Sequence, residues 1–144
     1  MKNNELLQCL CDALMLAEED LGALLTLCGH DAACAASLLQ DCSNEQMRCV
    51  LEGLILAERG PRSDGKPPDI NNKAMTNNDV LKKLRIALNL QEEDMLLVFE
   101  EGGTTLSQAE LGALFRNQGN KHFRACSDDL LQQFLGGFQP RLDT

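Results

Sequence analysis

Apolar residues recur at helical spacing along most of the chain. Between residues 77 and 90 they lie one, three, three and one positions apart, at Val80, Leu81, Leu84, Ala87 and Leu88. This spacing predicts a helix with one apolar face, for which Asn77 is the expected N-terminal cap. Lys82, Lys83 and Arg85 fall on the other face of that helix, which we expect to face solvent.

Capping signals and further apolar stripes predict the other helices. A helix over 92–101 should stop at Gly102-Gly103, and two more should open at Ser107, which starts a capping box with Glu110, and at Ser127. In the first half the same reasoning predicts helices near 4–17, 18–28, 31–40 and 43–58. Strand-like alternation is absent, so the sequence predicts an all-α fold with eight helices.

The chain contains an internal repeat. Residues 3–21 align without gaps on 77–95, with ten identical positions, and residues 42–54 align on 126–138. The offset grows from 74 to 84 between these two matches, so the second copy holds ten extra residues, most of them within 117–124. Such self-similarity is the signature of a duplicated structural unit. We therefore predict two tandem repeats of about four helices each.

A segment of different composition separates the copies. Three of the four prolines precede residue 70, and the segment has no apolar periodicity. The predicted organisation is a helical repeat over 1–60, a linker over 61–76 and a second helical repeat over 77–144. Units of about 60 residues are marginally stable alone, so we expect the repeats to pack together with pseudo-twofold symmetry.

Composition excludes several classes of function. The net charge of −9 disfavours nucleic-acid binding, and aromatic residues make up only 3% of the chain. Uncharged stretches are too short for a membrane-spanning helix, and no glycine-rich segment has phosphate-loop spacing, so we expect no membrane association and no cofactor. Seven cysteines, an odd number, favour reduced thiols and a cytoplasmic protein.

Two stretches of the second copy carry a family resemblance. NNDVLKKLRI at 77–86, together with residues 107–138, resembles the bacterial family typified by YehS, a tandem domain of unknown function. The first copy matches less well, because Cys11 stands opposite Arg85 and Gln40 opposite Arg124. The resemblance implies a small soluble bacterial protein built of two helical repeats, and it implies no reaction.

The thiols suggest a metal site only weakly. Cys28, His30 and Cys34 are close in sequence, but no Cys-x-x-Cys pair accompanies them. We interpret the cysteines as small packed side chains and predict no metal. The acidic runs 18–20 and 92–94 are explained by favourable placement at helix N-termini.

A second cluster lies before the last predicted helix, at Arg116, Lys121, His122, Arg124, Cys126 and Asp128. A thiol near an imidazole and a carboxylate permits nucleophilic chemistry, although no oxyanion loop accompanies it. Contact with an anion or ligand is the second interpretation. The third is structural, with Arg124 and Asp128 satisfying each other or helix ends while Cys126 packs under the helix.

The sequence thus predicts a non-enzymatic cytoplasmic module for protein interaction or regulation. The candidate residues for contact with a partner or an anion are Lys82, Lys83, Arg85, Arg116, His122 and Arg124. One alternative is a nucleic-acid-binding protein using Lys82, Lys83 and Arg85, and another is an enzyme with a site around 116–128. We also expect Leu10, Leu14, Leu84 and Leu88 to be buried, and charge reversal at Lys82 and Lys83 to leave the fold intact.

Overall fold

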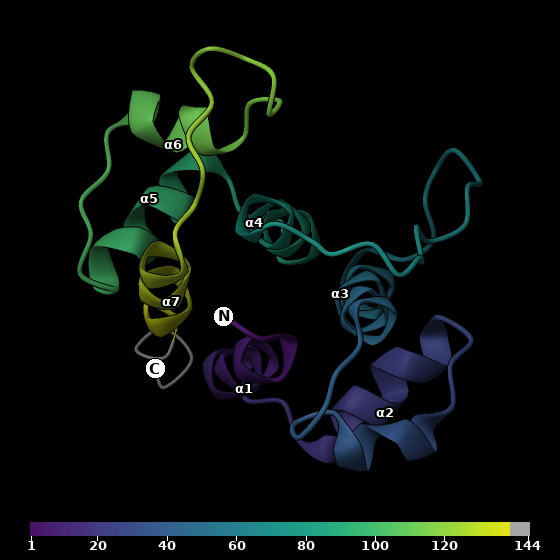
Figure 1. Cartoon of the computed structure of the whole chain (residues 1–144). Helices are drawn as coiled ribbons and strands as arrows, with labels where there is room; N and C mark the ends of the chain where they lie inside the picture. Colours follow the sequence, from purple (N-terminus) through teal and green to yellow (C-terminus); the bar gives the residue numbers. More distant parts are fainter. Residues whose placement is uncertain (139–144) are drawn as a thin grey trace.

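The computed structural model describes residues 1–138, which form helices and no strand (Figure 1). The elements are α1 (Asn3–Leu14), α2 (Glu18–Leu27), the 3-10 helix η1 (Ala32–Ser37), α3 (Asn44–Arg59), α4 (Asn77–Ala87), α5 (Glu92–Glu101), α6 (Gln108–Leu114) and α7 (Asp128–Gly136). The all-α prediction is confirmed, with one helix at each of the eight predicted places. No helix in this part of the chain is long and apolar enough to cross a membrane.

Helices α6 and α7 begin at the capping residues that the sequence indicated, Ser107 and Ser127. Ser107 accepts a hydrogen bond from the Glu110 amide at 3.1 Å, and the Glu110 carboxylate accepts one from the Ser107 amide at 3.1 Å. The expected cap of α4 was wrong by one residue. Thr76 caps this helix in a reciprocal pair with Asp79, because the Thr-x-x-Asp spacing satisfies two of the free amides at the helix start.

Three predicted helices are shorter than expected. The segment predicted over 31–40 forms only the short 3-10 helix η1, in which Ala35 is the one buried residue, so no apolar stripe supports a longer helix. Helices α1 and α4 end early, and Met15 and Asn89 just beyond them adopt left-handed backbone conformations. Leu14 and Leu88 lie at these ends and are only partly buried, contrary to expectation, whereas Leu10 and Leu84 are fully buried.

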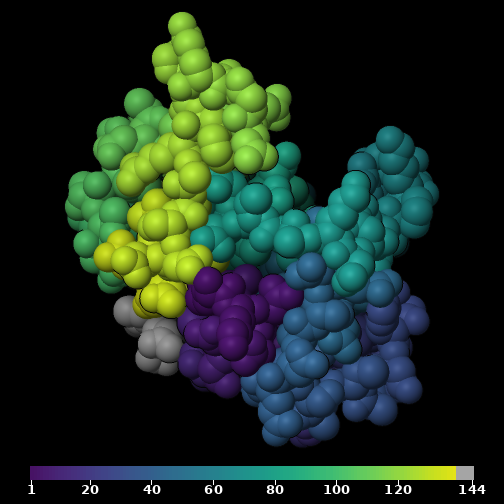
Figure 2. Space-filling view, viewed as in Figure 1, coloured from purple at the N-terminus to yellow at the C-terminus, as the bar shows by residue number. Residues whose placement is uncertain are grey.

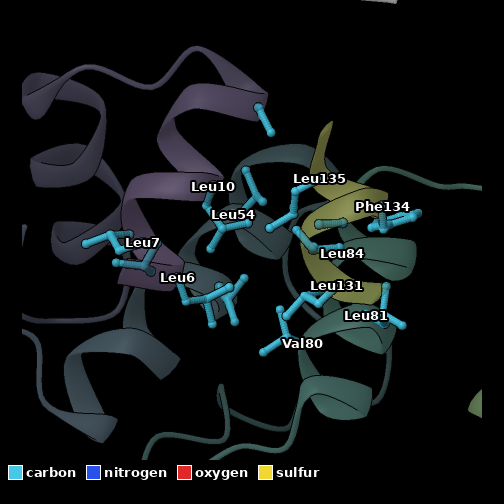
Figure 3. Close-up of a cluster of buried hydrophobic side chains, with 14 of the residues drawn as sticks. Leu6, Leu7, Leu10, Leu54, Val80, Leu81, Leu84, Leu131, Phe134 and Leu135 are labelled. Atoms are coloured by element: carbon cyan, nitrogen blue, oxygen red, sulfur yellow. The ribbon is translucent and has the colours of Figure 1, made fainter. Parts of the chain in front are cut away.

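Four helices, α1, α3, α4 and α7, surround the centre of the molecule (Figures 1 and 3). Helix α3 packs against α4, and α1 packs against α7, so helices from the two halves of the chain meet at both contacts. Their apolar residues form one core, to which α1 gives Leu7 and Leu10, α4 gives Leu81 and Leu84, and α7 gives Phe134. The two halves therefore share a single hydrophobic core.

The remaining helices cover this central group through close backbone approaches. Helix α2 packs on α3, where a Cβ added at Gly53 would lie 2.4 Å from the Leu24 carbonyl oxygen. Helix α5 packs on α7, where a Cβ added at Gly137 would lie 1.9 Å from the Val98 carbonyl oxygen. Glycine is required at both positions because any side chain would separate the helices.

We predict that Gly137→Ala lowers the free energy of unfolding by about 1–3 kcal/mol, because the added methyl group must push α5 and α7 apart. Gly136→Ala is the matched control, since a Cβ at Gly136 meets no atom within 4 Å. Urea unfolding followed by circular dichroism measures both variants. Equal midpoints for the two variants would show that the close approach at Gly137 is not a constraint.

The linker predicted over 61–76 has no helix or strand, but it is attached to α3. Arg48 donates a hydrogen bond from Nε to the Lys73 carbonyl oxygen at 3.0 Å and lies 3.7 Å from the Asp69 carboxylate. Asn44 donates to the Asn72 carbonyl oxygen at 3.2 Å. The predicted boundaries of the two repeats remain a prediction, and residues 139–144 of the second lie outside the described residues.

Candidate interaction groove

The three basic residues of α4 do not form one exposed patch. Lys82 is exposed, as expected. Lys83 instead forms an ion pair with Glu52 of α3, in which the two side chains are only 16% and 11% exposed. The expectation that Lys83 faces solvent is therefore wrong, because α3 covers that side of α4.

Arg85 is also occupied within the fold. Its Nε donates a hydrogen bond to the Leu90 carbonyl oxygen at 3.3 Å, and its guanidinium carbon lies 4.8 Å from the centre of the Phe115 ring. Stacking of this kind attracts the cation to the electron-rich ring face. Arg85 thus joins the end of α4 to the end of α6, and only Lys82 of the three cations is available to a partner.

A groove runs between α3, α4 and the linker. Its volume is about 590 Å³, and a second hollow of about 390 Å³ continues it along the linker. The groove is lined by Arg48, Glu52, Ile55, Arg62, Asp69, Asp79, Lys82, Lys83 and Ile86. Ile55, Arg62 and Ile86 line both hollows. The space-filling view shows the notch between α4 and the arm formed by the linker (Figure 2).

The groove differs from the rest of the surface in charge. Four cationic side chains and three carboxylates line it, which leaves one excess positive charge in a chain of net charge −9. Ile86 is 46% exposed and provides an apolar surface among these charges. Aliphatic side chains with a charged rim are typical of surfaces that bind protein segments.

The basic cluster predicted near α7 is dispersed. Arg124 lies 3.5 Å from the Glu110 carboxylate rather than next to Asp128. Asp128 accepts hydrogen bonds from the Asn77 amide at 2.8 Å and from the Met1 ammonium group at 2.6 Å, and these contacts hold its pKa below the usual value. Arg124 and Asp128 therefore do not satisfy each other, the first option of the structural interpretation, and Asp128 instead lies in the first turn of α7, as its second option allowed. His122 is exposed on the loop between α6 and α7.

Cys126 is buried, as the structural interpretation expected, and burial raises its pKa to about 11. A thiol with this pKa is almost wholly protonated near neutral pH, and the thiolate is the nucleophilic form. Its Sγ lies 3.5 Å from the Ser127 carbonyl oxygen, to which it donates. The environment of Cys126 therefore disfavours nucleophilic catalysis.

Asn78 is a residue whose role the sequence analysis missed. Its side-chain amide donates to the carbonyl oxygens of Leu114 and Arg124, both at 2.9 Å, and its Oδ1 accepts from the Cys126 amide at 2.9 Å. Three contacts from one side chain hold both ends of the α6–α7 loop against the start of α4. The repeated Asn-Asn pair at 77–78 was the available signal.

All seven cysteines are free thiols. Cys28 donates a weak hydrogen bond from Sγ to the Cys49 carbonyl oxygen at 3.4 Å, and His30 lies 3.8 Å from the Glu45 carboxylate. No three His, Cys, Asp or Glu side chains within residues 1–138 are grouped so that they could hold a metal ion. Cys28, His30 and Cys34 are thus not brought together as a ligand set.

The fold and the groove define an all-helical protein with a charged surface between its two halves. Residues 77–141 match a family described as "Protein of unknown function (DUF1456)". The chain is 36% identical to "Uncharacterized protein YehS" of Escherichia coli (strain K12) over 102 residues. This aligned stretch makes up 71% of this chain and 65% of that protein. These two matches support a YehS-like family of unknown function. No solved structure matches the chain.

Proposed function

We propose that the chain is a non-enzymatic cytoplasmic module for protein interaction, and that its groove between α3 and α4 binds a segment of a partner protein. The observation that carries this proposal is the groove itself, in which an exposed isoleucine lies among charges of both signs. The free, largely buried thiols support a reducing compartment.

The proposal includes a tandem arrangement of two helical repeats over 1–60 and 77–144, packed with pseudo-twofold symmetry. Corresponding hydrogen bonds support it, since Asn3 donates to the Cys42 carbonyl oxygen at 3.1 Å and Asn77 donates to the Cys126 carbonyl oxygen at 3.0 Å. The close approaches at Gly53 and Gly137 also correspond under the sequence alignment of the copies. In this arrangement the contact of α3 with α4 corresponds to that of α7 with α1.

The chemistry of the groove favours one kind of segment. Ile55 and Ile86 would contact an aliphatic side chain of the partner, and removal of that side chain from water would favour binding. The exposed Lys82 and the excess positive charge would attract a carboxylate, whereas Arg62, which lines both hollows, already pairs with Asp64 at 2.8 Å. The expected partner segment therefore combines an aliphatic residue with acidic residues.

We predict that a displayed library of random peptides, selected on the whole protein, yields sequences that pair an aliphatic residue with acidic residues. Ile86→Glu should weaken binding of the selected peptides at least about tenfold, because it removes the apolar contact and repels the acidic residues. Leu97→Glu is the matched control, since Leu97 on α5 is 44% exposed and does not line the groove. Fluorescence anisotropy measures the affinities.

Equal losses for the two variants would contradict the assignment of the groove. Enrichment of basic peptides would contradict the charge argument. If the protein instead shifts DNA or RNA in a gel with a steep salt dependence, and Lys82→Glu abolishes that shift, nucleic-acid binding would replace the proposed function.

A further inference from the structure

A second, smaller cleft lies between the start of α4 and the loop that follows α6. Its volume is about 150 Å³, and its lining includes Lys82, Arg116, Asn117, Phe115 and Phe123. This volume is below the roughly 300–1,000 Å³ of pockets for drug-sized ligands. The cleft can therefore hold a small group but not a nucleotide.

Two cations without partners meet at this cleft. Neither Lys82 nor Arg116 has an ion-pair partner within residues 1–138, whereas Lys83 and Arg124 both pair with carboxylates. Unpaired cations that share one concavity concentrate positive potential, because the low-dielectric walls focus the field. Two unpaired cations in one cleft contrast with the net charge of −9 of the whole chain.

The one carboxylate of the cleft is already engaged. Asp79 accepts a hydrogen bond from the Thr76 amide at 3.1 Å in the capping box of α4. It offsets one of the two cations, so one positive charge remains. The N-terminus of α4 also lies at the cleft and adds the positive end of its dipole.

The walls of the cleft are held in place by contacts described above. Arg85 stacks on Phe115, and Asn78 bonds both ends of the α6–α7 loop, at Leu114 and Arg124. Asn117 and Gln118 also line the cleft, and their side-chain amides are hydrogen-bond donors. A preformed site of this kind loses less entropy when it binds an ion.

We propose that this cleft is a binding site for a phosphate-class oxyanion, held by Lys82 and Arg116. Guanidinium and ammonium groups bind such oxygens through charge-assisted hydrogen bonds, and the planar guanidinium fork matches two of them at once. The site goes beyond the proposed function: Lys82 lines both the cleft and the groove, whereas Arg116 lines only the cleft, so a variant at Arg116 tests the cleft separately. Three of the lining residues, Asn117, Gln118 and Phe123, belong to residues 117–124, where the sequence alignment places most of the extra residues of the second copy.

The test is a titration of the ¹⁵N-labelled whole protein with inorganic phosphate at constant ionic strength. We expect saturable shifts of the amide signals of residues 76–82 and 115–123. Arg116→Gln should weaken the binding about fivefold or more, the loss expected when one solvated ion pair is removed. Lys121→Gln is the matched control, because Lys121 is an exposed cation of the same loop that does not line the cleft.

Free O-phospho-L-serine is the second probe and distinguishes the source of the anion. Tighter binding of phosphoserine indicates a phosphoryl group carried on a protein, and tighter binding of inorganic phosphate indicates a free anion; both support an oxyanion site. Shifts that do not saturate with either probe would overturn the proposal. Equal weakening by Arg116→Gln and Lys121→Gln would overturn it as well, because it would indicate general charge attraction.

Discussion

Leu84→Ala is expected to lower the free energy of unfolding by about 2–5 kcal/mol, the range for removing a large aliphatic side chain from a packed core. Leu84 is fully buried on α4 and points toward the side chains of α7, including Leu131 and Leu135 (Figure 3). The alanine would leave a cavity where the two halves of the chain meet. Urea unfolding monitored by circular dichroism measures the loss.

Leu88→Ala is the matched control for this experiment. Leu88 belongs to the same helical stripe but lies at the end of α4 and is only partly buried. Its truncation should cost clearly less than that of Leu84, because less apolar surface is returned to water. A loss below about 1 kcal/mol for Leu84→Ala would contradict the assigned core face of α4.

Lys83→Ala is expected to cost about 3 kcal/mol, because it leaves the Glu52 carboxylate without its partner in a site that is mostly closed to water. Lys82→Ala is the matched control. Lys82 is the neighbouring lysine on α4, but it is exposed and has no ion-pair partner in the described part of the chain, so its truncation should change stability by less than about 0.5 kcal/mol.

The double variant Lys83→Met/Glu52→Leu separates the charge effect from the packing effect. Replacing both charges with apolar side chains of similar size should restore most of the lost stability, because no buried charge then remains. A double variant less stable than Lys83→Ala would show that the ion pair itself favours the contact of α3 with α4. The same arrangement means that charge reversal at Lys83 would disturb the fold, contrary to the sequence-based expectation.

Features set by neighbouring residues could be predicted from the sequence. The capping box of Ser107 and Glu110 depends on residues three apart, so the start of α6 was evident from the local pattern. The burial of Leu84 followed in the same way from the apolar stripe. The start of α4 was misplaced although its signal, Thr-x-x-Asp at Thr76 and Asp79, was present in the sequence.

The groove could not be predicted because its residues come together only through packing. Lys83 looked solvent-exposed from the pattern of α4 alone, and its partner Glu52 lies on another helix, 31 residues away. Arg48 and Glu52 of α3 carried a signal that was not used. They lie four residues apart on one face of α3, within the stretch 47–54 that is buried throughout. Charged residues in such a stretch require partners.

The pairing of α1 with α7 also has a consequence for the order in which the chain folds. Helix α7, against which α1 packs, is synthesised more than a hundred residues after α1. The contact of α1 with α7 can therefore form only after both the first and the second half of the described chain have been made. Such distant contacts slow folding because a long loop must close before they form, and apolar surface that is exposed during this interval favours aggregation.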